Sequence, residues 1–117
     1  MIDLANIINK YGYPKAMIDY SNQSKKLIFK FDEIIYMDSN HDIFINEEKV
    51  SGDYFNIWQK CIESWKDTTK NNEIAALGFF SYDFKNILYP NYSFNNNSNK
   101  QIPYFWFGKP SVVIDID

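Results

Sequence analysis

The chain has 117 residues, a net charge of −3 and 45% hydrophobic residues, which is the composition of one soluble globular domain. Its single cysteine excludes an internal disulfide and a cysteine-rich zinc site. All twelve basic residues are lysines, and no apolar run reaches the ~20 residues of a membrane span. We therefore expect no nucleic-acid partner, no membrane span and, without a visible leader peptide, a cytoplasmic protein.

The first half of the sequence predicts one helix followed by short strands. Asp3 can cap a helix whose apolar residues recur at helical spacing, and Gly12 followed by Pro14 marks its end. Turn residues then separate apolar runs that are typical of strands. After a short apolar run at 16–18, we predict strands at 27–31 and 34–37, and a hairpin at 43–45 and 49–50.

The second half predicts a longer helix, a glycine-containing strand and a final pair of strands. Ser51 or Asp53 can cap the helix, whose apolar residues recur every three or four positions up to Trp65. The apolar run 74–80 is typical of a strand buried on both faces, and its Gly78 indicates close backbone packing. We further predict a helix at 84–89 and strands at 104–107 and 112–116.

Together these elements predict an α+β fold, in which a mostly antiparallel sheet carries two or three packed helices. Aromatic residues make up 19% of the chain, and such residues favour strands, cores and interfaces. We therefore expect an exposed aromatic surface, with self-association of the chain as its consequence.

No complete catalytic or metal-binding constellation is visible among the polar residues. His41 lies in a polar turn and is best explained as a solvated side chain. Cys61 lies on the apolar stripe of the second helix, where a buried structural thiol is favoured over a nucleophile. Adjacent carboxylates face opposite sides of a strand. We therefore assign no catalytic residue and no metal ligand.

One segment of the chain resembles a known family. Gly78, Tyr82 and Asp83 have the order and spacing of the Gly-x-x-x-Tyr-Asp strand of chorismate-utilising enzymes. The proline-aromatic-glycine segment 102–108 and the apolar strand after it resemble the strand pair that follows in that family. The chain is thus similar to the N-terminal region of component I of aminodeoxychorismate synthase and of its sister, anthranilate synthase.

A second segment resembles one branch of the family more than the other. Lys30, Phe31 and Asp32 are similar to the basic-Phe-Asp segment of the aminodeoxychorismate branch, where arginine is usual at the first position. The family's Gly-Gly pair is replaced here by Ala75 and Ala76. An anthranilate-forming parent, or one that makes a salicylate-type product, stays an alternative.

The resemblance implies a function for a longer parent chain. Such enzymes use Mg²⁺ and ammonia to replace a ring hydroxyl of chorismate with an amino group, and a glutamine amidotransferase subunit supplies the ammonia. Residues 1–117 would then be an N-terminal domain without cofactor and inactive alone. The catalytic groups and Mg²⁺ ligands would belong to a C-terminal domain in cis.

The resemblance also implies a tryptophan pocket in this region. Carried over by position, its residues are Ser21 for the polar groups of the ligand, Phe31 for the indole and Asp32 for the ammonium. Gly78, Tyr82 and Asp83 are implied to be structural.

A reading from a different class is a stand-alone binding module without enzymatic parentage. Such a module would use its aromatic surface to hold a protein or an apolar ligand. The apolar strand that runs to the last residues favours the first reading, because a complete module is expected to end in a polar tail.

Overall fold

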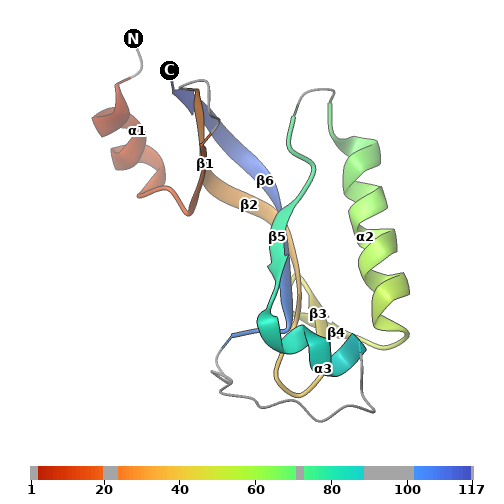
Figure 1. The fold of residues 1–117 in the computed structure, drawn as a ribbon. Helices are drawn as coiled ribbons and strands as arrows, with labels where there is room; N and C mark the ends of the chain where they lie inside the picture. The colour runs from red at the N-terminus through yellow and green to blue at the C-terminus, as the bar shows by residue number, and fades with distance from the viewer. Residues whose placement is uncertain (1–2, 20–23, 71–72, 89–101, 117) are drawn as a thin grey trace.

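The computed structural model describes residues 3–19, 24–70, 73–88 and 102–116, and its fold is α+β with one antiparallel sheet, as predicted (Figure 1). The sheet order is β4-β3-β2-β6-β5, and β1 also pairs with β2. The elements in chain order are α1 (Leu4–Tyr11), β1 (Ala16–Asp19), β2 (Lys25–Met37), β3 (Ile43–Ile45), β4 (Glu48–Val50), α2 (Tyr54–Thr68), β5 (Leu77–Phe80), a 3₁₀ turn (Tyr82–Phe84), α3 (Lys85–Leu88) and β6 (Phe105–Ile116).

The predicted starts of the two helices and the predicted end of α1 are confirmed by their caps, whereas α2 continues to Thr68, beyond the expected start of a polar linker at Asp67. Asp3 accepts hydrogen bonds from the amides of Ala5 and Asn6 at 3.1 and 3.3 Å, and Gly12 ends α1 with φ at +83°. Asp53, rather than Ser51, caps α2. No helix in the described segments has the length and apolar character needed to cross a membrane.

The predicted hairpin is also confirmed. Asn46 and Glu47 join β3 to β4 with φ values of 51° and 71°, the left-handed conformation that the type I′ hairpin turn requires at both central positions. The Asn46 side-chain oxygen accepts the Ile34 amide at 2.9 Å, which ties this turn to β2.

The prediction of four separate strands at 27–37 and 104–116 is wrong, because each segment forms one long strand. β2 and β6 pair along their whole length, with register shifts between Ile28 and Glu33. Phe31 pairs with Pro110 and Glu33 with Lys109, so Asp32 is the extra residue of a bulge. In the sequence, polar and proline residues indicate that a strand ends. Here the bulge accommodates these residues within the long strands.

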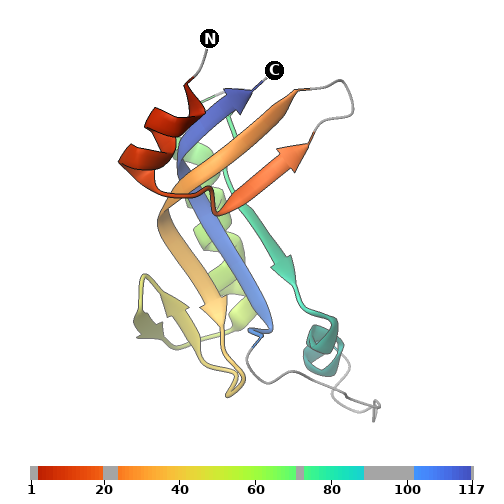
Figure 2. The same cartoon turned by 90° about the vertical axis from the view of Figure 1, so that its left-hand side faces the viewer.

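The prediction that the apolar run 74–80 is buried on both faces is also wrong. β5 is an edge strand that pairs only with β6 among the described strands. Phe79 and Phe80 are 44% and 42% exposed. The reason is topological, since the apolar run lies at the edge of the sheet rather than between two strands (Figure 2).

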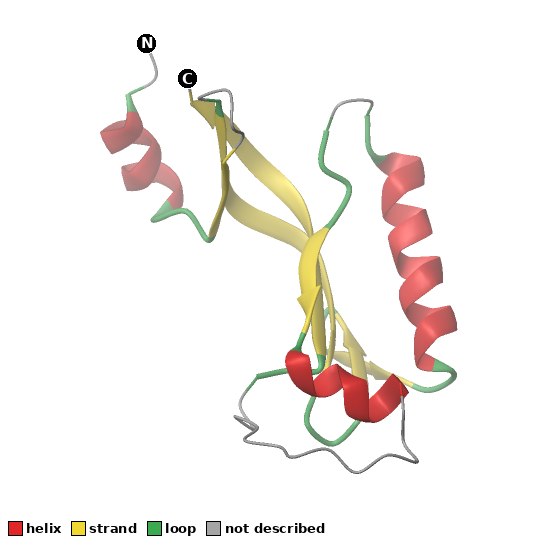
Figure 3. Cartoon of the chain, in the orientation of Figure 1, coloured by secondary structure: helices red, strands yellow, loops and turns green. Residues whose placement is uncertain are grey.

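The main core lies between one face of the sheet and the helices that follow it. Trp65 of α2 is 2% exposed and packs in one cluster with Ile35 and Met37 of β2 and Phe105 of β6. The 3₁₀ turn and α3 close the same cluster with Phe84 and Ile87. Figures 1 to 3 show α1 at the other end of the sheet, on the opposite side from α2.

Candidate functional site

The face of the sheet opposite α2 carries a row of aromatic side chains. Phe105 and Phe107 belong to the α2 side, so Trp106 between them points to the opposite face. The register places Phe44, Tyr36, Trp106 and Phe79 directly opposite one another on four neighbouring strands. We call these four residues the aromatic row. The Tyr36 and Phe44 rings are stacked with centroids 5.1 Å apart.

An apolar hollow lies on this face next to the aromatic row. Its volume is about 460 Å³. The hollow brings together side chains from β2, β5 and β6 and from the start of β1. Its lining residues are Lys15, Ala16, Phe31, Ile34, Leu77, Gly78, Phe79 and Trp106.

Two glycines give the hollow its shape. The Phe31 ring meets Trp106 edge to face, with centroids 5.0 Å apart. It lies over Gly108, where an added Cβ would come within 2.5 Å of the Phe31 ring. An added Cβ at Gly78 would overlap the backbone carbonyl oxygen of Trp106. The close packing predicted for Gly78 is therefore confirmed.

The structure brings together only part of the predicted ligand set. Phe31 lines the hollow, whereas Asp32 is exposed and is not among the lining residues. The bulge explains this separation, because it turns Asp32 out of the paired ladder. Ser21 lies outside the described residues.

The residues of the Gly-x-x-x-Tyr-Asp segment have different surroundings. Gly78 is on β5 and lines the hollow. Tyr82 is 80% exposed, and the Lys85 ammonium lies 3.6 Å from the centroid of its ring. Asp83 is half-buried in the 3₁₀ turn. Sequence reasoning missed Lys15 and Trp106, although the alternation around Gly108 could have indicated the face of Trp106.

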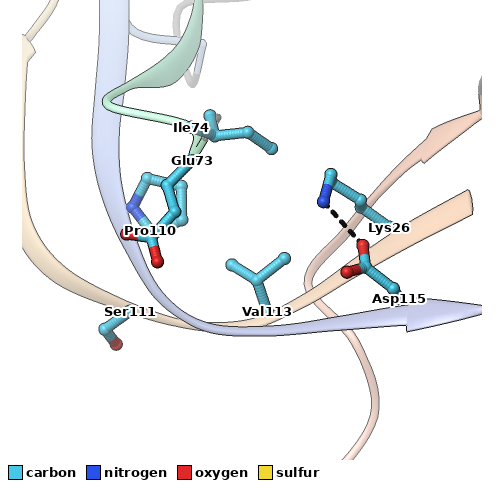
Figure 4. Close-up of a pocket in the computed structure, with 7 residues that line it drawn as sticks. All are labelled: Lys26, Glu73, Ile74, Pro110, Ser111, Val113 and Asp115. Carbon is cyan, nitrogen blue, oxygen red and sulfur yellow. Dashed lines mark hydrogen bonds and ion pairs between the residues drawn. The ribbon is translucent and has the colours of Figure 1, made fainter. Parts of the chain in front are cut away.

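A second, smaller hollow is polar and measures about 200 Å³ (Figure 4). Lys26 of β2 and Asp115 of β6 pair across the sheet at 2.6 Å beside it. The Lys26 side chain is 24% exposed and that of Asp115 71%, so water screens the pair. The remaining lining residues are Glu73, Ile74, Pro110, Ser111 and Val113.

The two residues considered as reactive groups have structural surroundings. Half-burial on α2, followed by the charge of Glu33, raises the pKa of the Cys61 thiol to about 11, which disfavours the nucleophilic thiolate. His41 Nε2 lies 3.3 Å from the Tyr104 hydroxyl, and the two rings meet edge to face. The described residues contain no group of three or more His, Cys, Asp or Glu side chains that could hold a metal ion.

No family model, no curated protein and no solved structure matches this chain.

Proposed function

We propose that the chain is the N-terminal, non-catalytic part of an aminodeoxychorismate synthase component I-like enzyme of the cytoplasm. The parent would convert chorismate and ammonia to 4-amino-4-deoxychorismate, a step towards p-aminobenzoate and folate. Its Mg²⁺ would act as a Lewis acid on the leaving hydroxide, and component II, a glutamine amidotransferase, would supply the ammonia. The Mg²⁺ ligands and catalytic groups are assigned to a C-terminal domain in cis.

One observation carries this proposal: the two segments of the resemblance pair directly. Gly78 of the Gly-x-x-x-Tyr-Asp segment lies opposite Phe107 of the proline-aromatic-glycine segment. The glycine is required there, because a side chain would overlap the Trp106 carbonyl. The glycine thus has a steric role where the two segments of the resemblance meet. This makes the resemblance more specific than a match of residue types alone.

The aromatic row gives the catalytic domain a place to pack. Phe79 is 44% exposed, and α2 lies on the other side of the sheet (Figure 2). Large exposed apolar surface on a sheet favours contact with another protein surface. In this proposal the row packs against the C-terminal domain, and the isolated chain self-associates through the same face.

The test is an assay of the native polypeptide that contains this sequence. The purified protein is incubated with chorismate, Mg²⁺ and ammonia, and the product is identified by mass spectrometry. We expect 4-amino-4-deoxychorismate from the native protein and no product from residues 1–117 alone. Anthranilate would move the chain to the tryptophan branch. Amination by residues 1–117 alone, or none by the native protein with its amidotransferase, would overturn the proposal.

We also propose that the parent has a tryptophan site, but with only part of the residue set that the resemblance implies. Phe31 lies in the hollow and can pack an indole ring. The bulge leaves Asp32 outside that hollow, so the ammonium contact depends on residues such as Ser21 or on the C-terminal domain. Calorimetry of the native protein with tryptophan tests this, and unchanged affinity in Asp32→Ala would remove Asp32 from the site.

A stand-alone binding module is the second candidate, and the aromatic row is the observation that favours it. Four aromatic side chains on one sheet face can hold a protein segment without any enzymatic parentage. Sedimentation separates the two candidates only in combination with the length of the native chain, because both expect association through this face.

A further inference from the structure

We propose that β5 pairs edge to edge with the β5 strand of a second copy of this chain, so that the two sheets become one. The contact is made by the backbone at the edge of the sheet, whereas the proposed function assigns the apolar face to a catalytic domain. The proposal rests on the hydrogen-bonding direction of the strands and on the residues of the sheet edges. It does not depend on the chorismate-enzyme assignment.

The hairpin turn at Asn46 fixes the hydrogen-bonding direction of the neighbouring strands. The Asn46 amide donates to the Ile34 carbonyl and the Ile34 amide donates to the Asn46 side chain, both at 2.9 Å. The backbone groups of Ile34 therefore point away from β6. Because this direction alternates along a strand, the groups of Ile35 face β6 and its partner Phe107 faces β2. The groups of Trp106, one residue earlier, then face β5.

Two residues of β5 therefore present their backbone groups at the open edge. Phe79 lies opposite Trp106 and shares its hydrogen bonds. Gly78 and Phe80, on either side of Phe79, consequently point away from β6. The Ser81 amide donates at 2.8 Å to the carbonyl of the residue before β6, which fits the same alternation. Within the described part of the chain, neither Gly78 nor Phe80 has a hydrogen bond on the outer side of β5.

The side chains of β5 also distinguish it from the other edge strands. β4 carries Glu48 and Lys49, and β1 ends at Asp19. Charged residues on an edge strand oppose pairing with another chain. β5 has the sequence Leu-Gly-Phe-Phe, without charge or proline, and it pairs with β6 without a register shift. Figure 2 shows it at the margin of the sheet, with α2 behind the other strands. Among the edges of the described sheet, β5 is thus the one best suited to accept another strand.

The edge of β5 is complementary to itself in one antiparallel register. When Phe79 lies opposite Phe79 of the second copy, each Gly78 lies opposite a Phe80, and each of these pairs exchanges two hydrogen bonds. The Phe79 ring is 44% exposed, and an aromatic pair across two strands is favourable. Each Phe80 ring, 42% exposed, can cover the glycine opposite it, as aromatic side chains do at edge glycines. The two aromatic rows then form one continuous row.

Hydrogen exchange of the wild-type chain at low and high protein concentration tests the edge directly. The Gly78 and Phe80 amides should exchange freely in dilute solution and about tenfold more slowly when the chain is concentrated, because pairing protects them. The Phe79 amide is bonded to β6 in both states and should not change. We expect a weak dimer, since the paired strand has only four residues.

A charge swap at Phe79 tests the register. In Phe79→Lys, and likewise in Phe79→Glu, like charges face each other across the two-fold axis, so each variant should raise the dimer dissociation constant about tenfold. An equimolar mixture of the two variants should dimerise about as tightly as the wild type, because an ammonium then faces a carboxylate. Phe44→Lys, at the other end of the aromatic row on β3, is the matched control and should leave the constant unchanged. Sedimentation equilibrium measures the constants, and circular dichroism shows that the variants are folded.

The proposal is overturned by a wild-type chain that stays monomeric at high concentration, by protection of Gly78 and Phe80 that does not depend on concentration, or by a variant mixture that dimerises no better than either variant alone. An equal loss in Phe44→Lys and Phe79→Lys would also overturn it, because the contact would then lie on the face of the sheet. None of these results bears on the chorismate assay. Failure of the edge contact and failure of the proposed function are therefore distinguishable.

Discussion

The two ends of the long strand β2 are covered very differently. Around Ile35 and Met37, both 0% exposed, the α2 helix contributes Trp65 to a core that β6 completes. Around Ile28 and Phe29 the sheet residues are equally buried, yet α1 contributes no buried residue of its own. One strand thus belongs to a firmly packed end and a lightly covered end, and burial of the strand alone does not tell them apart.

The consequence is an uneven distribution of stability. Helix α1 touches the sheet through side chains such as Tyr11, whose ring centroid lies 6.2 Å from that of Phe29 and which stays 40% exposed. Local opening is expected where few apolar contacts hold an element. We therefore expect the α2 end to set global stability and the α1 end to open first.

The largest effect is expected from Trp65→Ala at the α2 end. Removing a side chain that is 2% exposed should lower the free energy of unfolding by ~3–5 kcal/mol, the usual cost of Trp→Ala in a core. Urea unfolding monitored by circular dichroism measures it. A loss below ~1 kcal/mol would mean that α2 does not hold the core.

The alkylation rate of the Cys61 thiol measures how firmly α2 packs against the sheet. With its pKa raised from 9.0 to about 11, alkylation at pH 8 should be about a hundredfold slower than for an ordinary thiol. The same reaction in urea-unfolded chain is the control. The thiol ionises less readily in the folded chain than in the unfolded chain, because its folded-state pKa is the higher one. The stability that is linked to this pKa difference is therefore present in full below about pH 9 and is lost as the pH rises from about 9 to about 11. Equal alkylation rates in folded and unfolded chain would contradict the packing.

Gly78→Ala tests the packing that shapes the hollow. The added Cβ would overlap the Trp106 carbonyl, so β5 must shift, at a cost of ~1–3 kcal/mol. Gly12→Ala is the comparison variant, because nothing lies within 4 Å of its added Cβ and only the backbone strain at its φ of +83° opposes a side chain, at a cost of ~1–3 kcal/mol. Thermal unfolding compares the two. A neutral Gly78→Ala would show that β5 is loosely held.

Leu4→Ala should have a small effect at the α1 end. The side chain is 41% exposed, so the loss should stay below ~1 kcal/mol. Hydrogen exchange gives the sharper readout, because amides of α1 should exchange faster than those of α2. Equal protection of the two helices would remove the contrast between the ends.

The smallest effect is expected from Asp115→Asn, which breaks the ion pair with Lys26. An exposed pair contributes ~0.2–1 kcal/mol, and 1 M salt should abolish most of the difference. Chemical unfolding at two salt concentrations measures it. A loss above ~2 kcal/mol that persists in salt would show a role beyond the pair.

Local signals in the sequence predicted what local interactions decide. Asp3, Gly12 and Asp53 were predicted as caps because a cap depends on the few residues around it. The continuity of β2 through Asp32 and the edge position of β5 were missed, since both depend on strands that pair over long sequence distances. Hydrophobic pattern alone cannot tell an edge strand from a buried one when its partners are unknown.

The candidate site was predictable to a similar degree. Phe31 came from the resemblance, and Gly78 from its place in a strand. Lys15 was missed because it precedes a strand and reaches the hollow only through the pairing of β1 with β2. Phe31 and Asp32 are separated by the bulge. The bulge could not be predicted from the residues next to it in the sequence.

The measurement that tests the central claim most directly is the mass of the native polypeptide, captured from its source cells with an antibody raised against this chain. The account predicts a chain of several hundred residues, in which the aromatic row packs against a catalytic domain. A native polypeptide that ends at Asp117 would contradict it and leave a binding module.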